Sequence, residues 1–139
     1  PGDGPVSEED DAKLKAAGEI LRRGGLVAFP TETVYGLGGD ALNPTSSKRI
    51  YAAKGRPSDN PLIVHIYRFE DIYKITGDVP EEARRIADAF WPGPLTMILP
   101  KSDAVPYETT GGLDTVLRHP VPILLGNRVL PWPNMSWKI

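Results

Sequence analysis

The stretch Pro30–Ile66 decides the fold of this chain; it reads PTETVYGLGGDALNPTSSKRIYAAKGRPSDNPLIVHI. It places hydroxyl side chains, a glycine-rich turn, a Lys-x-Arg pair and a histidine between two short apolar strands, Leu26–Phe29 and Leu62–Ile66. Ordinary packing of helices and loops does not need this mixture, whereas a pocket for a polyanionic ligand does. The stretch therefore predicts a polyanion-binding site between two strands.

Helix and strand signals alternate along the chain. Ser7, followed by acidic residues, predicts the start of a first helix. Asn43 and Pro44 predict the cap and first position of a second helix, which Gly55 ends. The remaining elements are a helix from Pro80 and strands at Leu95–Leu99 and Thr115–Leu117. This alternation predicts an α/β fold with a mixed sheet and flanking helices.

Length and composition limit the possible functions. The 139 residues suffice for about one domain, and the 15 prolines and 14 glycines indicate many loops rather than a helical bundle. A net charge of −2 gives no overall attraction to nucleic acid or to an anionic membrane. The chain has no cysteine, which excludes disulfides and thiolate catalysis and fits a cytoplasmic protein. No apolar run approaches the length of a membrane span, so we expect no membrane association.

Lys54 and Arg56 form the first candidate site. They lie one residue apart on a chain that Gly55 bends and Pro57 holds, so both cations can converge on one anion. The alternative is that they only complement the negative end of the preceding helix. The rigid polar turn that follows favours a ligand, and Asn60 is placed to hydrogen-bond it, although asparagine in a turn often serves its own backbone.

Three further patterns are weaker. Thr31, Thr33 and Tyr35 alternate, so they line one wall of an extended segment or simply belong to an edge strand. Residues 36–41 satisfy the dinucleotide pattern G-x-G-x-x-A, but no strand runs into the glycines and no helix starts on them. We therefore interpret them as a tight turn or as a close approach of the backbone to a ligand. Residues 109–112, TTGG, predict a turn whose backbone N–H groups hold phosphate oxygens.

Histidine is the remaining chemistry-bearing residue type. His65 lies in an apolar strand, where a lone histidine is more often a core residue than a catalyst, but a substrate contact is also possible there. His119 is the only other histidine, and the two do not have zinc-ligand spacing. We therefore expect no metal held by the protein itself.

Four motifs stand out before Arg118: PTETVYGL at 30–37, KGRP at 54–57, NPL at 60–62 and FWPGPLT at 90–96. Together they resemble the YrdC-like family, the threonylcarbamoyl-AMP synthases that start threonylcarbamoyladenosine modification of tRNA. The resemblance implies a twisted mixed sheet with flanking helices around a deep basic cavity. It also implies a nucleotidyltransferase that converts L-threonine, bicarbonate and ATP to threonylcarbamoyl-AMP and pyrophosphate, with Mg²⁺ carried by ATP.

The resemblance assigns roles to individual residues. The residues matched to the L-threonine site are Thr33, His65 and Arg118, and those matched to the ATP site are Lys54, Arg56, Asn60 and Thr115. Catalysis would rest on positioning of the substrates and on the positive charge that Lys54 and Arg56 bring to the phosphates. The implied partners beyond the substrates are tRNA or double-stranded RNA and the tRNA threonylcarbamoyl transferase machinery.

The chain departs from the family pattern around Arg118. The family usually reads Thr-Val-Ala-Val-Arg, whereas residues 115–118 read TVLR, one residue shorter. After Arg118 the family continues to a Ser-x-Asn motif, and residues 119–139 contain none. We therefore expect a YrdC-like part at 1–118 and a divergent tail at 119–139 that forms no separate domain.

Other functions stay open from the sequence. A double-stranded RNA-binding module would also suit a basic cavity, but the net acidity and the lack of aromatic residues among the basic ones count against it. A catalytically incomplete fragment of the same fold would fail to bind ATP. A carbamoyl-transferring domain of the hydrogenase-maturation type would act without threonine.

Overall fold

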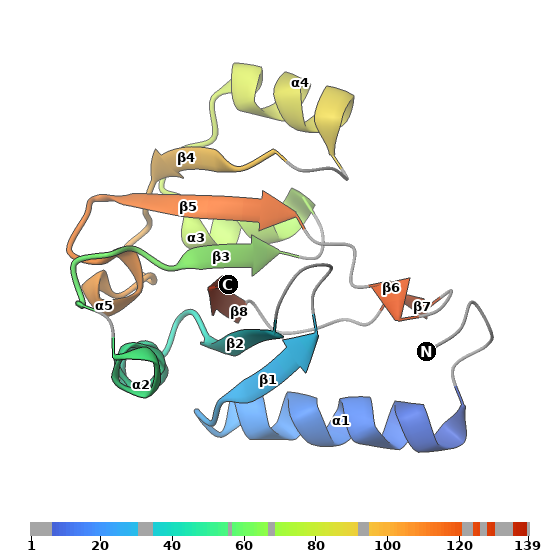
Figure 1. Ribbon diagram of the computed structural model, residues 1–139. Coiled ribbons are helices and arrows are strands. Elements are labelled where there is room, and N and C mark those ends of the chain that lie inside the picture. Colours follow the sequence, from blue (N-terminus) through green and yellow to red (C-terminus); the bar gives the residue numbers. More distant parts are fainter. Residues whose placement is uncertain are drawn as a thin grey trace.

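The computed structural model describes residues 7–30, 35–55, 57–66, 69–91, 95–120, 124–125, 128–129 and 135–138. Its helices are α1 (Glu8–Arg22), α2 (Pro44–Lys54), η1 (Phe69–Asp71), α3 (Ile72–Ile75), α4 (Glu81–Phe90) and α5 (Tyr107–Thr110). Its strands are β1 (Val27–Pro30), β2 (Tyr35–Asp40), β3 (Ile63–Ile66), β4 (Met97–Pro100), β5 (Thr115–Pro120), β6 (Leu124–Leu125), β7 (Arg128–Val129) and β8 (Met135–Lys138). The α/β architecture predicted from the sequence is confirmed (Figure 1).

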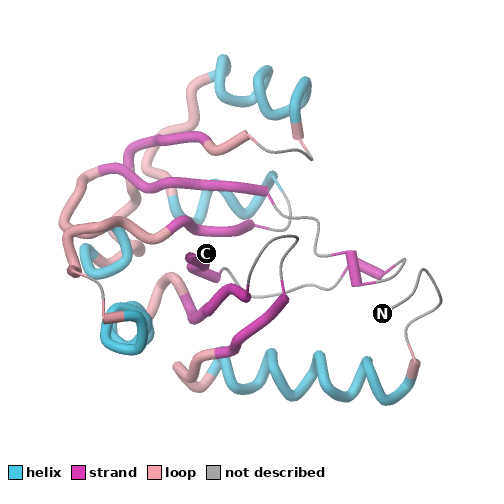
Figure 2. Tube along the Cα trace, in the orientation of Figure 1, coloured by secondary structure: helices cyan, strands magenta, loops and turns pink. Residues whose placement is uncertain are grey.

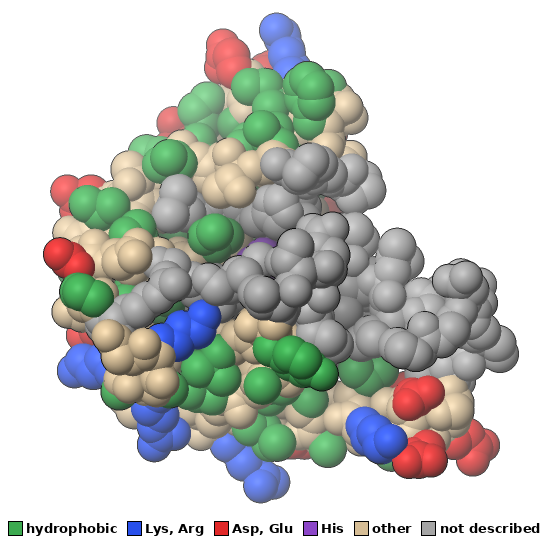
Figure 3. All heavy atoms as spheres, in the orientation of Figure 1, with side chains coloured by type: hydrophobic (Ala, Val, Ile, Leu, Met, Phe, Trp, Pro, Cys, Tyr) green, Lys and Arg blue, Asp and Glu red, His purple; other side chains and the backbone are tan. Residues whose placement is uncertain are grey.

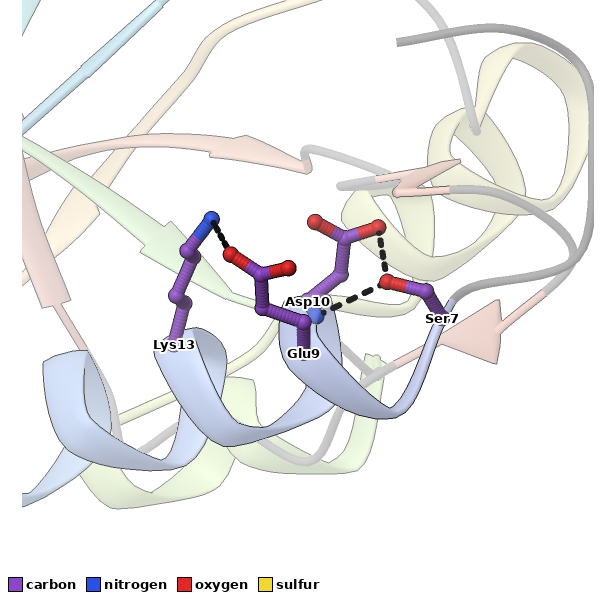
Figure 4. Close-up of polar contacts among 4 residues, drawn as sticks. All are labelled: Ser7, Glu9, Asp10 and Lys13. Carbon is purple, nitrogen blue, oxygen red and sulfur yellow. Dashed lines mark hydrogen bonds and ion pairs between the residues drawn. The ribbon is translucent and has the colours of Figure 1, made fainter.

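Short polar caps start the first two helices, as predicted. The Ser7 hydroxyl accepts a hydrogen bond from the Asp10 N–H at 3.0 Å and donates one to the Asp10 carboxylate at 2.8 Å (Figure 4). The bond from the Ser7 hydroxyl to the carboxylate lowers the pKa of the Asp10 carboxyl, and the Ser7 backbone adds to this effect. In the same first turn Glu9 pairs with Lys13, four residues later, at 2.8 Å. At the start of α2 the side chain of Asn43 accepts hydrogen bonds from the N–H groups of Thr45 and Ser46. Local sequence alone therefore fixes where both helices begin.

One mixed sheet forms the centre of the molecule, in the order β1-β2-β8-β3-β5-β4. Among the described strands of this sheet, only β3 and β5 pair in parallel, and the other neighbouring strands pair antiparallel. Among the described strands, β8 alone joins the β1–β2 hairpin to the β3–β5–β4 block. The sequence analysis did not anticipate a strand at Met135–Lys138, because four residues carry no usable periodicity.

Apolar side chains from both ends of the sheet make the core. The larger cluster joins β3, β4 and β5 to the helices α3 and α4, and its buried members are Ala41, Val64, Ile66, Ile72, Ile75, Ala83, Ala87, Met97, Val105 and Val116. A second cluster, Ile50, Tyr51 and Leu62 with Leu26 beside it, packs α2 against the start of β3. In Figure 1, α1 runs beneath the β1–β2 hairpin and α4 lies above β4.

The prediction of a glycine-rich turn at residues 36–39 is wrong, because these residues belong to strand β2. A side chain at Gly36 would overlap the ring of Phe29 on the neighbouring strand. A Cβ at Gly39 would lie 3.0 Å from Leu26 Cδ2 and 3.2 Å from Ser46 Cβ. The glycines therefore allow β1 and α2 to pack closely on β2, which is the close-approach alternative with a protein neighbour in place of a ligand.

Charged side chains lie at several places on the face shown in Figure 3. Acidic and basic groups mix over the start of α1, and basic groups lie over α2 and the far end of α1. The longest described helix, α1, has 15 residues and an acidic first turn. None of the helices in the described part combines the length and apolar character that crossing a bilayer requires.

Candidate nucleotide and amino-acid site

The turn between α2 and β3 carries two of the predicted ATP-site residues. Helix α2 ends at Lys54, and Gly55 follows with a left-handed φ of 60°, which turns the chain away from the helix axis. Lys54 is partly buried, whereas Asn60, at the far side of the same turn, is exposed. Lys54 at the end of the helix and the exposed side chain of Asn60 thus lie at opposite ends of one short turn.

The backbone of this turn is tied to the helix before it. The buried Tyr51, 5% exposed, donates its phenolic O–H to the backbone carbonyl of Asn60 at 2.6 Å. Burial raises the pKa of the Tyr51 phenol above its ordinary value of 10.0, and the nearby Asp59 carboxylate adds to the rise. The phenol is therefore a neutral donor at physiological pH, and it holds the residue whose side chain is the candidate ligand.

The parallel pair β3–β5 arranges the other predicted residues. Ile63 pairs with Leu117 and Val64 with Arg118, so Thr115 lies near the start of β3, where the Asn60 turn ends. Arg118 is placed by its backbone beside Val64, and His65 is level with His119. His65 is partly buried and alternates with the buried residues of β3.

This register separates the two predicted sites along the strands. Thr115 and Asn60 share the amino end of the parallel pair, and His65 lies four residues beyond the level of Thr115. At ~3.3 Å per residue the offset is about 13 Å. Of the predicted residues on these two strands, Thr115 from the ATP set therefore lies at one end, and Arg118 and His65 from the L-threonine set lie further along.

The turn predicted within residues 109–112 is present at Gly111 and Gly112, but the prediction that its N–H groups hold an anion is wrong. Thr109 and Thr110 are buried in α5, and their hydroxyls donate to the carbonyls of Ala41 and Leu113, each at 2.7 Å. The N–H groups of residues 111–113 donate to carbonyls of the same turn, those of Tyr107 and Thr110. These donors are used within the protein, so the segment has a structural role.

Two predicted site residues, Thr33 and Arg56, lie outside the described residues, as does the rest of the Thr31–Val34 segment. Their roles stay predictions. Tyr35, the last residue of the proposed hydroxyl wall, opens β2 and is 76% exposed. Within the described residues no group of three or more His, Cys, Asp or Glu side chains could hold a metal ion.

Sequence reasoning did not identify Tyr51 and Gly111 as neighbours of the site. Tyr51 reaches Asn60 across nine residues and Gly111 contacts Asp59 across more than fifty, so no local pattern links them. The only available signal was the Gly111-Gly112 pair, which indicates a turn with positive φ.

Comparisons with known proteins agree with this architecture. The chain is 57% identical over 107 residues to a threonylcarbamoyl-AMP synthase of Pyrococcus abyssi (strain GE5 / Orsay), which covers 77% of this chain and 32% of that protein. It is 50% identical over 121 residues to a threonylcarbamoyl-AMP synthase of Bacillus subtilis (strain 168), covering 84% of this chain and 35% of that protein. The chain thus spans about a third of the length of these relatives.

A solved structure and a family model match the same part of the chain. The crystal structure of P. abyssi Sua5 complexed with L-threonine superposes with a TM-score of 0.74 at 56% identity, covering 78% of this chain and 32% of that chain. The family model for Sua5, YciO and YrdC, described as "Telomere recombination", matches residues 19–121, which is more than half of the 139 residues. On these grounds the chain belongs to the Sua5/YciO/YrdC family.

Proposed function

We propose that this chain carries a threonylcarbamoyl-AMP synthase site, which joins L-threonine, bicarbonate and ATP to give threonylcarbamoyl-AMP, pyrophosphate and water. The main support is the 57% identity to a protein of that name over 107 residues. The α2–β3 turn and the β3–β5 pair lie within residues 19–121, which the family model matches. The L-threonine in the related crystal structure supports an amino-acid substrate.

The proposed reaction needs no covalent enzyme intermediate. The amino group of L-threonine adds to the carbon of bicarbonate or carbon dioxide and gives a carbamate. A carbamate oxygen then attacks the α-phosphorus of ATP, the bond from that phosphorus to the bridging oxygen breaks, and pyrophosphate leaves. Positioning of the two reactants and stabilisation of phosphate charge supply most of the catalysis in such a transfer.

The residues of the α2–β3 turn fit the phosphate side of this reaction. The ammonium group of Lys54 and the guanidinium group of Arg56 would neutralise phosphate charge, and the exposed Asn60 would hydrogen-bond the nucleotide. Thr115 at the same end of the sheet would contact ATP, and His65, Thr33 and Arg118 would bind L-threonine. Mg²⁺ would arrive on the phosphate oxygens of ATP.

The test measures incorporation of labelled bicarbonate into an adenylate in the presence of ATP, Mg²⁺ and L-threonine. We expect product that disappears when L-threonine is omitted. Lys54→Met should lower the rate about 100-fold, because it removes the positive charge that would stabilise the reacting phosphate. Lys48→Met is the matched control, since Lys48 is an exposed lysine of the same helix.

Two results would contradict the proposal. One is the absence of threonine-dependent product from a chain that circular dichroism shows to be folded. The other is an equal rate for Lys54→Met and Lys48→Met, which would show that Lys54 has no role in the reaction. Salt-dependent binding of RNA without nucleotide turnover would favour the RNA-binding alternative instead.

A further inference from the structure

The turn that carries Asn60 is held from two sides, by α2 and by α5. From α2, the Tyr51 phenol donates to the Asn60 carbonyl at 2.6 Å. From α5, the carbonyl of Thr109 accepts the N–H of Leu62 at 3.0 Å, just after the turn. Helices α2 and α5 lie beside each other at one end of the sheet (Figure 2). The turn is therefore fixed at two points along its backbone.

Gly111 allows the backbone at the end of α5 to lie close to the backbone of the Asn60 turn. It ends α5 with a left-handed φ of 65°. A Cβ built on it would lie 2.8 Å from the Asp59 carbonyl oxygen and 3.0 Å from the Pro61 nitrogen. Both neighbours are backbone atoms, so no side-chain rotation could make room. Only glycine lets the backbone of α5 approach the residues on both sides of Asn60.

Helix α5 is itself anchored in the interior. The Thr109 hydroxyl donates to the Ala41 carbonyl at 2.7 Å and lies 2.7 Å from the Ser47 hydroxyl. Because the single hydroxyl hydrogen of Thr109 is used on Ala41, Ser47 is the donor in the second bond. Both hydroxyls are fully buried. These bonds attach α5 to the first turn of α2 and to the residue Ala41 before it, so the two helices together form one connected support for the turn.

Helix α5 also leads directly into β5. Gly111 lies four residues before Thr115, the other predicted ATP residue at this end of the sheet. We infer that Tyr51 and Gly111 are positioning residues that hold the Asn60 turn at a fixed place relative to Thr115, and that ATP affinity depends on them. This inference rests on the proposed function, because it assigns ATP to the site.

Tyr51→Phe tests the inference with little risk to folding, because it keeps the buried ring and removes only the donor to Asn60. We expect the dissociation constant for ATP, measured by calorimetry, to rise about fivefold. The dissociation constant for L-threonine should stay within experimental error, and amide exchange at Asn60 and Leu62 should speed up. A purely structural role would weaken both ligands together. Tyr73→Phe, which removes an exposed phenol on α3, should change neither.

The pair Gly111→Ala and Gly112→Ala is a second, independent test. Both residues have positive φ, but a Cβ at Gly112 meets nothing within 4 Å. We expect Gly111→Ala to weaken ATP binding at least tenfold beyond any change in Gly112→Ala.

The outcomes separate this inference from the proposed function. If the unaltered chain fails to bind ATP, both are overturned. If it binds ATP and Tyr51→Phe binds equally well, or the two glycine variants bind ATP alike, only the positioning role is overturned.

Discussion

At the scale of single residues, two adjacent glycines differ in what surrounds them. Gly111 and Gly112 have φ values of 65° and 86°, so an alanine at either position costs roughly 1–2 kcal/mol of backbone strain. Only at Gly111 does the added Cβ also press on backbone atoms of Asp59 and Pro61. We therefore expect Gly111→Ala to lower the free energy of unfolding by about 2–5 kcal/mol and Gly112→Ala by about 1–2 kcal/mol. Urea unfolding of the three proteins measures the difference, and equal losses would mean that the turn yields to the new methyl group.

Tyr51 gives a prediction for alkaline pH. Its pKa in the folded protein is raised above 10.0 by burial and by the Asp59 carboxylate. Above pH ~10 the unfolded chain releases the phenolic proton while the folded chain retains it, so stability falls as pH rises through the folded pKa. Below pH ~10 the contribution is fully present.

We expect the free energy of unfolding to decline above pH ~10, and to decline less steeply in Tyr51→Phe. The exposed Tyr107 phenol also has a raised pKa, because it donates to the Asp114 carboxylate at 2.8 Å. Tyr107→Phe is therefore the proper comparison. Denaturant unfolding between pH 8 and 11 gives both slopes, and an unchanged slope in Tyr51→Phe would show that another group titrates there.

At the scale of elements, local signals in the sequence were sufficient for the helices that have caps. Ser7, Asn43 and Gly55 fix helix ends through contacts within a few residues, so their roles follow from the sequence alone. We predicted that backbone N–H groups of residues 109–112 hold phosphate oxygens, because the distant partners of this segment cannot be recognised in the sequence. Thr109 bonds to Ala41 and Ser47, 68 and 62 residues earlier in the chain.

The same reason explains the error at Gly36–Gly39. Glycines in a turn and glycines that admit a neighbour look alike in one sequence, and the neighbours Phe29 and Ser46 are known only from the fold. For the candidate site, the sequence correctly predicted that α2 ends at Gly55 and that a polar turn follows, whereas the ligand roles of Lys54 and Asn60 stay predictions. It could not identify Tyr51 as the residue that holds the turn, because that contact depends on how α2 packs.

Strand β8 makes a prediction at the same scale. Ser136 pairs with Gly39 on one side and with Val64 on the other, so its backbone N–H faces a neighbouring strand. Ser136→Pro removes that donor from the middle of the sheet, and we expect a loss of about 3 kcal/mol or more in the free energy of unfolding. Ser136→Ala keeps the N–H and should lose much less. Similar urea midpoints for the two variants would mean that β8 contributes little to the sheet.

At the scale of the whole molecule, the proposed site lies within one block of the sheet and its supports. The α2–β3 turn, the β3–β5 pair and α5 all belong to the part that the family model matches, residues 19–121. The curated relatives are about three times longer than the matched part. The activity assay on this chain therefore measures what the matched part does by itself.

The position of β8 has a consequence for how the protein is made. A ribosome synthesises residues 135–138 after the other described strands of the sheet, yet these residues lie between β2 and β3. Until they emerge, the facing edges of β2 and β3 have no strand between them, and an open edge pairs readily with other chains. Assembly of the sheet is therefore completed only after β8 has been translated. A ribosome that stalls within the tail segment leaves a nascent chain that depends on chaperones to stay unaggregated.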